Sequence, residues 1–167
     1  MLGDNGKAAK VTVDGTDFET VEYQPFNPGR MSHKLRRPGL RYEVALSIAR
    51  CYIVSINGPF LCGEWSDLRI ARSHLHHLLG PREYYLADAG YRSGNGPAVQ
   101  RNGLPVRRRG MFKKLMARHE TINRRFKEFR ILGTRFRHEE DKHGEVFHCI
   151  AVLVQIDIVR GNNTFNI

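Results

Sequence analysis

The sequence predicts a mixed α/β domain in which a central mixed sheet is flanked by helices. Short β-prone apolar runs fill the first part of the chain, apolar residues recur at helical spacing after Ser66, and two longer helical segments follow. A chain of 167 residues, 41% of them hydrophobic, is long enough to bury one core of ordinary size. We therefore expect a single domain over residues 1–167, with residues 1–10 as a tail.

Four strands are expected in the first half of the chain. The first apolar run leads directly into Asp14, and Gly15 and Thr16 supply turn chemistry after it. Alternation of apolar and polar residues makes the third strand half-buried, and Asn57-Gly58-Pro59 ends the fourth. The expected strands are residues 11–13, 19–24, 41–49 and 51–56.

Helices dominate the second half. Ser66 is an N-cap candidate for a helix that Gly80-Pro81 stops, and a short buried strand over 84–87 then delivers Asp88. Gly, Asn, Pro and Arg are frequent in the next segment, which is typical of a loop. The remaining expected elements are a mobile loop over residues 93–110, with a further weak strand candidate at 98–100 or 104–106, and helices over 111–130 and 146–158.

The net charge of +10 is confined to one segment. Residues 101–137 contain thirteen lysines and arginines against two glutamates, while the rest of the chain is close to neutral. A local basic field suits a polyanionic backbone as partner, although a solvated helix and loop would give the same pattern. The residues expected to contact nucleic acid are Arg107, Arg108, Arg109, Lys113, Lys114, Arg124, Arg125 and Lys127.

Three carboxylates have contexts that suggest one active site: Asp14 in VTVDGTDF, Asp88 in YYLADAGY and Glu120 in ARHETINRRF. Asp14 and Asp88 each end a β-prone run, and Glu120 lies in a basic helical segment. Phosphodiester cleavage commonly uses two Mg²⁺ or Mn²⁺ ions about 4 Å apart, and carboxylate oxygens suit such hard cations. Each acid alone is more often a surface carboxylate or a helix cap.

The motifs resemble those of a known family along residues 11–158. VDGTDF, the run SHKLRRPGLRYEVALSI over 32–48, INGPFLCGEWSDL over 56–68, LADAGY and RHETINRRFKEFRIL are similar to segments of DDE-type transposase catalytic domains of the PIF/Harbinger kind, the DDE superfamily endonucleases. The resemblance implies an RNase H-like fold, two bound Mg²⁺ or Mn²⁺ ions, and DNA cleavage and strand transfer in the nucleus. Asp14 would then bridge the two ions, with Asp88 and Glu120 each completing one side.

Family members normally carry a DNA-binding region upstream, and this chain begins a few residues before Asp14. The resemblance therefore implies that a separate DNA-binding protein supplies target recognition. Two alternatives remain open at the level of sequence. One is a domesticated relative that binds DNA without cutting it, and the other is a ribonuclease of the same fold, because fold alone does not set function.

Several residues compete for roles at this site. Asp17 lies close to Asp14, but Asp14 directly follows the apolar run and fills the family position. Asp67 is expected in the first turn of a helix, where its charge favours the helix dipole. His74, His76 and His77 lack a third ligand nearby, so we expect exposed helix histidines rather than a zinc site. His119 is expected in the core or behind the metal ligands.

Glu120 poses a geometric problem. Leu115, His119, Ile122, Phe126 and Phe129 form an apolar stripe, and on a straight helix Glu120 lies roughly 140° from its centre. It shares a face with Met116, Asn123 and Lys127 instead. Either the helix is irregular near Glu120, or the stripe packs on the C-terminal helix and another face meets the sheet.

The remaining features exclude some protein classes. The three cysteines are widely spaced and odd in number, which argues against a disulfide framework and a zinc finger. No apolar run is long enough to cross a membrane, so no membrane partner is expected.

Overall fold

The structure of the protein is a computed structural model that describes residues 8–50, 52–94 and 96–162. Its strands are β1 (Ala8–Glu19), β2 (Met31–Ser32), β3 (Arg37–Ser47), β4 (Ile53–Leu61), β5 (Glu83–Leu86) and β6 (Ala98–Val99). Its helices are α1 (Asp67–Ser73), α2 (Leu75–Leu78), α3 (Val106–Glu128), α4 (Arg130–Gly133) and α5 (Asp141–Val159). Short 3-10 turns lie at Pro28–Arg30, Ala89–Tyr91 and Arg101–Gly103.

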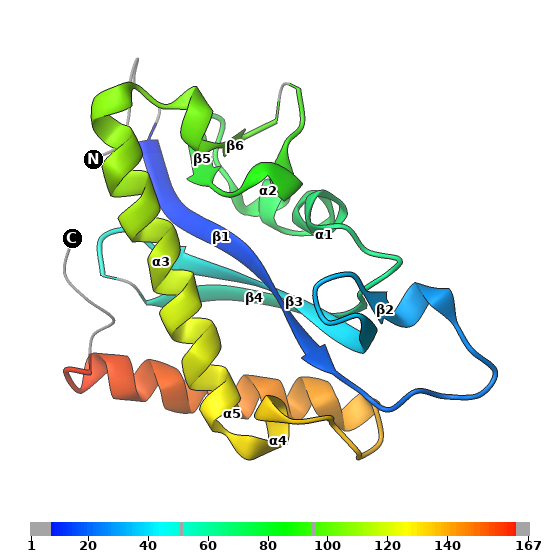
Figure 1. The fold of residues 1–167 in the computed structure, drawn as a ribbon. Helices are drawn as coiled ribbons and strands as arrows, with labels where there is room; N and C mark the ends of the chain where they lie inside the picture. The colour runs from blue at the N-terminus through cyan, green and yellow to red at the C-terminus, as the bar shows by residue number, and fades with distance from the viewer. Residues whose placement is uncertain (1–7, 51, 95, 163–167) are drawn as a thin grey trace.

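The six strands form one mixed sheet (Figure 1). β3 pairs antiparallel with β1 on one side, and with β2 and β4 on the other. β1 pairs in parallel with β5, which in turn pairs in parallel with β6. The expected mixed α/β architecture, with a central mixed sheet flanked by helices, is confirmed.

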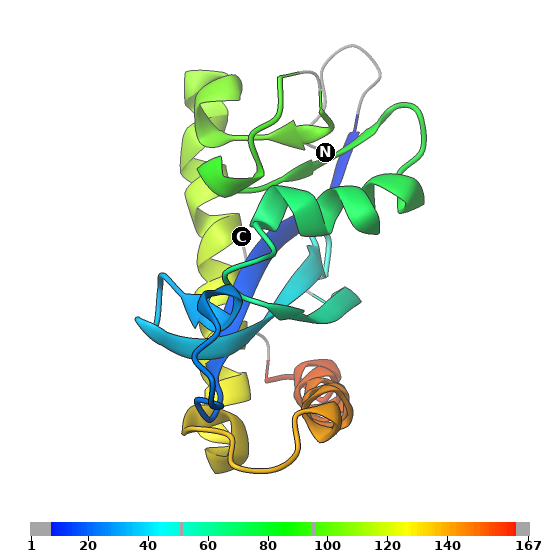
Figure 2. The ribbon, with the colours of Figure 1, turned by 90° about the vertical axis from the view of Figure 1, so that its right-hand side faces the viewer.

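Helices cover both faces of the sheet (Figures 1 and 2). On one face, α3 and α5 pack against β1 and β3 through a core that includes Phe18, Tyr42, Ile122, Phe126 and Phe147. On the other face, α1 and α2 bury Ala71 and Leu75 against Val13, Tyr85 and Tyr91. The face of a strand residue therefore decides which helices it meets, because successive side chains point to opposite faces.

The strands extend further than the sequence patterns suggested. Gly15 and Thr16 were expected to form a turn, but β1 continues through them because β3 pairs with it as far as Glu19. Asn57-Gly58-Pro59 likewise lies within β4, where the register against β3 shifts. Gly58 has φ +140° and a Cβ there would lie 2.7 Å from Tyr42 Cδ1, so this irregular strand needs a glycine.

Other boundaries also differ. Residues 19–24 form no strand beyond the end of β1, since Thr20 makes only an isolated bridge to Phe136. The predicted strand over 51–56 starts at Ile53, and Cys51 lies outside the described residues. Residues 93–110 contain β6, a 3-10 turn and the start of α3, and Asn95 lies outside the described residues. The weak strand candidate at 98–100 thus corresponds to β6.

Across the part of the chain that the structure describes, no helix has the length and apolar character that a bilayer crossing requires.

Candidate acidic site

The candidate site lies where β1 and β5 part. β5 pairs with β1 only as far as the Thr12–Leu86 partners, while β1 runs on to Glu19 with β3 on its other edge. The edge of β1 beyond Thr12 is therefore not covered by β5. At this edge the Gly15 N–H donates to Asp14 Oδ1 at 2.9 Å, and Lys34 Nζ donates to the Gly15 carbonyl at 3.0 Å. Asp14 thus sits in the middle of a strand and at an open sheet edge.

Asp88 reaches the same edge from the end of β5. It caps the 3-10 turn Ala89–Tyr91, whose Gly90 N–H donates to Asp88 Oδ1 at 2.8 Å. The residue is exposed, in contrast to the buried residues of β5 just before it. Residues that follow the carboxyl end of a strand parallel to its neighbour commonly form sites of this kind.

The two acids are electrostatically coupled. Burial raises the pKa of Asp14 to about 6, and Asp88 and Asp67 add to the rise while Lys34 opposes it. The largest cause of the shift is burial, and the smaller contributions of Asp88 and Asp67 indicate that both lie near enough to Asp14 to oppose its ionisation. A bound cation would relieve that repulsion.

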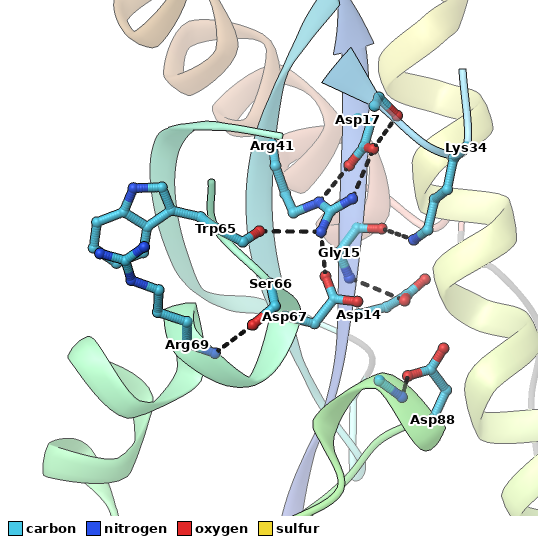
Figure 3. A network of polar contacts seen from close by, with 12 residues as sticks. Asp14, Gly15, Asp17, Lys34, Arg41, Trp65, Ser66, Asp67, Arg69 and Asp88 are labelled. Atoms are coloured by element: carbon cyan, nitrogen blue, oxygen red, sulfur yellow. Dashed lines mark hydrogen bonds and ion pairs between the residues drawn. The ribbon is translucent and has the colours of Figure 1, made fainter. Parts of the chain in front are cut away.

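Asp67 is the third acid that the structure brings here (Figure 3). It begins α1 directly after the N-cap Ser66, as expected from its place in the first turn. Its side chain is only 15% exposed, and Arg41 Nη1 lies 3.2 Å from its Oδ1. Burial raises the pKa of Asp67. The positive charges of Arg41 and Lys34 oppose this rise, and the negative charge of Asp88 adds to it. The residue therefore belongs to the same electrostatic cluster as Asp14 and Asp88.

Asp17 has a different environment. Arg41 donates to both of its carboxylate oxygens, Nε to Oδ1 at 2.7 Å and Nη2 to Oδ2 at 2.9 Å, and Ser32 Oγ donates to Oδ2 at 2.6 Å. Burial alone would raise the pKa of Asp17, but these hydrogen bonds outweigh it and lower the pKa. Its carboxylate is fully engaged inside the fold.

Two further polar groups lie behind the acids. Glu43 in β3 is the register partner of Gly15 and is only 3% exposed, and burial with a contribution from Asp67 raises its pKa to about 8. Tyr91 is fully buried, and its pKa is raised by burial first and then by Glu43, Asp67 and Asp14. Among the described residues, Glu43 Oε2 and the Tyr91 hydroxyl have no hydrogen-bond partner.

Glu120 lies on the helix side of this region and is exposed. α3 is continuous from Val106 to Glu128, so the alternative of an irregular helix is not needed. The apolar stripe of α3 contacts both the sheet and α5. His119 Nε2 lies 2.9 Å from Thr12 Oγ1 of β1, and Ile122 and Phe126 pack in the core with residues of α5. Glu120 falls outside that buried stripe.

The neighbours of Glu120 on its own flank indicate which way it faces. Met116 packs against the cluster that contains Leu86 of β5, and Lys127 Nζ lies 5.7 Å from the centre of the Phe18 ring of β1. The flank that carries Glu120 therefore borders the strands. Even so, the acids that raise the pKa of Asp14 most are Asp88 and Asp67, and Glu120 is not one of them.

The expected nucleic-acid contacts divide into two groups. Arg107, Lys113, Lys114, Arg124 and Lys127 are exposed on α3. Arg109 instead donates to the Leu104 carbonyl at 3.2 Å, and Arg125 donates to Asp157 of α5 at 3.2 Å. Arg108, like Arg109, is half-buried. The second group, Arg108, Arg109 and Arg125, therefore packs or makes polar contacts within the fold.

His119 and His76 make polar contacts inside the fold, whereas His77 is exposed as expected. His119 is buried, and burial lowers its pKa to about 3, so its expected place in the core is confirmed. His76 is half-buried rather than exposed, with Nε2 3.0 Å from the Tyr85 hydroxyl. His74 interrupts the expected helix between α1 and α2.

The carboxylates suit a divalent cation in chemistry, and in geometry only in part. Asp14 and Asp88 offer the oxygen donors that Mg²⁺ and Mn²⁺ prefer, from a crowded cluster whose repulsion a cation would offset. Over the described ranges, however, no three His, Cys, Asp or Glu side chains are arranged closely enough to hold a metal ion. Glu120 would have to move toward the strands to complete a three-acid set.

Comparison with protein-family models matches no family to this chain. Searches of curated proteins and of solved structures likewise find no similar protein.

Sequence reasoning placed the acids of the two strands but underrated the residues around them. The sequence predicts Asp67 only as a residue that favours the helix dipole, and it predicts no role at this site for Arg41 or Glu43. One signal was available: Arg41 and Glu43 are charged residues on one face of a strand whose neighbours are apolar. Charged residues in a strand that is buried on both faces need partners, so they point to a polar site.

Proposed function

We propose that this chain is an RNase H-like nucleic-acid-processing domain that cleaves phosphodiester bonds in DNA with divalent metal ions, in the manner of a DDE-type transposase. The observation that carries the proposal is the meeting of Asp14 and Asp88, each from its own sequence motif, at one open sheet edge with coupled charges. Dispersed acids gathered at a sheet edge are the arrangement that metal-dependent phosphodiesterases use.

The fold supports the proposal at a coarse level. β1 belongs to an antiparallel set with β3 and β4 and also to a parallel pair with β5, and helices lie on both faces. This mixed sheet is compatible with an RNase H-like domain. The acids occur in the expected order of strand, strand end and helix, at Asp14, Asp88 and Glu120.

The residues of the site have separable tasks in this reaction. Bound Mg²⁺ or Mn²⁺ would activate the attacking water and neutralise charge on the attacking and leaving oxygens. Asp14 and Asp88 would hold the cations, and Glu120 would close the site from α3. Lys34, which donates to the Gly15 carbonyl beside Asp14, places a positive charge where a phosphate would approach.

The charge of α3 supports a polyanionic substrate. Exposed Arg107, Lys113 and Lys114 lie near its start, and Arg124 and Lys127 lie beyond Glu120. Basic side chains along the helix that carries the third acid would position a nucleic-acid backbone without reading its sequence. Target recognition would then come from a separate DNA-binding partner.

A second candidate function is DNA binding without cleavage. The exposed position of Glu120, outside the cluster formed by Asp14, Asp67 and Asp88, favours it. Such a protein would keep the basic surface that binds DNA, but Asp14, Asp88 and Glu120 would not come together around a metal ion.

The decisive experiment is a nuclease assay on the purified chain. Supercoiled plasmid, linear duplex DNA, single-stranded RNA and an RNA–DNA hybrid are incubated with Mg²⁺, Mn²⁺ or EDTA. We expect cleavage of DNA with either metal, none with EDTA, and none with Asp14→Asn. That substitution should not unfold the protein, because the Asp14 carboxylate is already crowded by burial and by like charges.

The matched control is Glu139→Gln, which removes one carboxylate charge from an exposed residue near the start of α5. This variant should cleave like the wild type. DNA binding without metal-dependent cleavage would contradict the proposed nuclease function and support DNA binding without cleavage. Cleavage restricted to RNA or to the hybrid would make the protein a ribonuclease instead.

A further inference from the structure

Asp67 occupies a position between the backbone segments that follow the two strand acids (Figure 3). A Cβ at Gly15 would lie 2.5 Å from Asp67 Oδ1, and a Cβ at Gly90 would lie 2.8 Å from Asp67 Oδ2. Gly15 directly follows Asp14, and Gly90 follows Asp88 by two residues. One carboxylate therefore fills the space beside both acidic motifs, and each motif has its glycine where that carboxylate lies.

A buried ion-pair network holds Asp67 in place. Arg41 Nη1 lies 3.2 Å from Asp67 Oδ1 and donates to the Trp65 carbonyl at 3.2 Å. The rest of the guanidinium grips Asp17, whose side chain is 1% exposed. Because Arg41 is fixed at both ends inside the fold, it orients the Asp67 carboxylate as well as balancing its charge.

The polar layer behind Asp67 is incompletely satisfied. Asp67 Oδ1 accepts no hydrogen bond of good geometry, and the same holds for Glu43 Oε2 and the Tyr91 hydroxyl, all buried. Glu43 and Tyr91 are each more than nine-tenths buried, and both interact electrostatically with Asp67. Buried polar atoms without a protein partner commonly bind an ordered water or an ion. The site is thus equipped for a hydrated ligand on its inner side.

We propose that Asp67, oriented by Arg41, is a positioning residue of the site, whose carboxylate fixes the spacing of Asp14 and Asp88 and strengthens their hold on a divalent cation. This inference rests on the proposed function, in which Asp14 and Asp88 bind the metal. Asp67 acts through its place between Gly15 and Gly90, and through its negative charge on the inner side of the pair.

The primary test is Mn²⁺ binding to the whole chain without nucleic acid, followed by electron paramagnetic resonance of the free ion. The variants are Asp67→Asn, which keeps shape and removes charge, and Asp67→Glu, which keeps charge and changes length. We expect Asp67→Asn to weaken Mn²⁺ binding about tenfold, the size expected of one unit charge acting on a divalent ion across partly hydrated protein. Asp67→Glu should also weaken binding, because its longer side chain moves the carboxylate out of the space beside Gly15 and Gly90.

A substitution that changes no charge provides the second test. Gly15→Ala adds a Cβ whose nearest neighbours are the Asp67 carboxylate and, at 3.7 Å, Arg41 Cδ, so it displaces Asp67 and little else. We expect Mn²⁺ binding to weaken several-fold at unchanged net charge. In the Gly15→Ala/Asp67→Ala double variant the clash is gone, so its thermal stability should exceed the sum of the two single effects.

The outcomes separate the two proposals. Wild-type protein that binds no Mn²⁺ overturns the proposed function and this inference with it. Mn²⁺ binding that is unchanged in Asp67→Asn and Gly15→Ala overturns the role of Asp67 alone, and so does wild-type Mn²⁺ affinity in Asp67→Glu. Glu139→Gln controls for net charge and should bind Mn²⁺ like the wild type, and thermal unfolding of each variant verifies that it folds.

Discussion

The candidate site has two sides: Asp14, Asp67 and Asp88 form the strand side, and Glu120 of α3 forms the helix side. The two sides differ in how rigidly the fold holds their carboxylates. Asp14 lies in a strand paired from Val11 to Glu19 with β3, and Asp67 is oriented by an arginine that is itself held by a buried aspartate. Glu120 lies on an exposed flank of α3, and the helix is anchored through other residues, including His119 and Ile122. Asp14 and Asp67 are thus preorganised, and Glu120 is not.

The difference suggests a division of labour. Groups fixed by register and buried ion pairs can bind a cation before substrate arrives. A carboxylate on an exposed flank can join only after a modest shift, which a nucleic acid bound along the basic helix could supply. The comparison thus predicts that metal binding and cleavage respond differently to changes on the two sides.

The largest expected effect is the loss of cleavage in Asp88→Asn. The substitution removes a ligand charge at the end of β5 and nearly keeps the shape, so the rate of metal-dependent plasmid nicking should fall by about a thousandfold or more. DNA binding measured by fluorescence anisotropy should persist, because phosphate contacts on α3 do not use the metals. Wild-type nicking by this variant would remove Asp88 from the site.

Glu120→Gln should separate the two sides most clearly. We expect nicking to fall by about a hundredfold, while Mn²⁺ affinity without DNA changes by less than about threefold, because this exposed carboxylate is not part of the strand-side cluster. Calorimetric titration of Mn²⁺ into the variant and into Asp88→Asn checks the contrast. Equal losses of Mn²⁺ affinity in both variants would show that the helix acid is as preorganised as the strand acids.

Arg41→Met tests the ion-pair network beneath the strand side. The change leaves Asp17, with its side chain 1% exposed, without its cation, so the free energy of unfolding should drop by about 3–5 kcal/mol. Urea denaturation at neutral pH measures it. Arg125→Met breaks a pair with an Asp157 side chain that is 46% exposed, and it serves as the matched control with a smaller expected loss.

Glu43→Gln should change the pH dependence of stability. Burial raises the pKa of Glu43 from 4.5 to about 8, so between those values the folded chain keeps a proton that the unfolded chain releases. Stability from this group is therefore full below pH 4.5 and is lost as pH rises toward about 8. Urea denaturation should show that Glu43→Gln gains stability relative to wild type at pH 8 compared with pH 5. An identical pH profile for both proteins would contradict this.

The smallest effect concerns the basic helix. Replacing the exposed Lys113 and Lys114 with glutamine should reduce the slope of log affinity against log salt by about two, as release of two counterions requires. Replacing the exposed Arg50 and Arg160, which lie outside α3, is the control and should leave the slope unchanged. An unchanged slope in the lysine variant would show that this part of α3 is not the contact.

Local sequence patterns were enough to predict the positions of Asp14 and Asp88, but not the positions of the residues around them. The apolar run before Asp14 and the one before Asp88 indicated strands, and parallel pairing of β1 with β5 as far as Thr12 and Leu86 brings the two acids to the same part of the sheet. Asp67 could not be placed, because its approach to Gly15 and Gly90 depends on how the α1 segment packs over the sheet. The turn expected at Gly15 was wrong for the same reason, since pairing with Glu43 overrides local turn preference.

The contact of His119 with Thr12 makes the seam between α3 and β1 sensitive to acid. Burial keeps the ring neutral in the folded protein down to a pKa of about 3, whereas the same ring in the unfolded chain takes up a proton near 6.5. The stabilising effect of the neutral ring is full above pH 6.5 and declines as the pH falls toward 3. Acidification therefore favours states in which α3, the helix that carries Glu120, has separated from β1, because His119 takes up a proton there at a higher pH than in the folded protein.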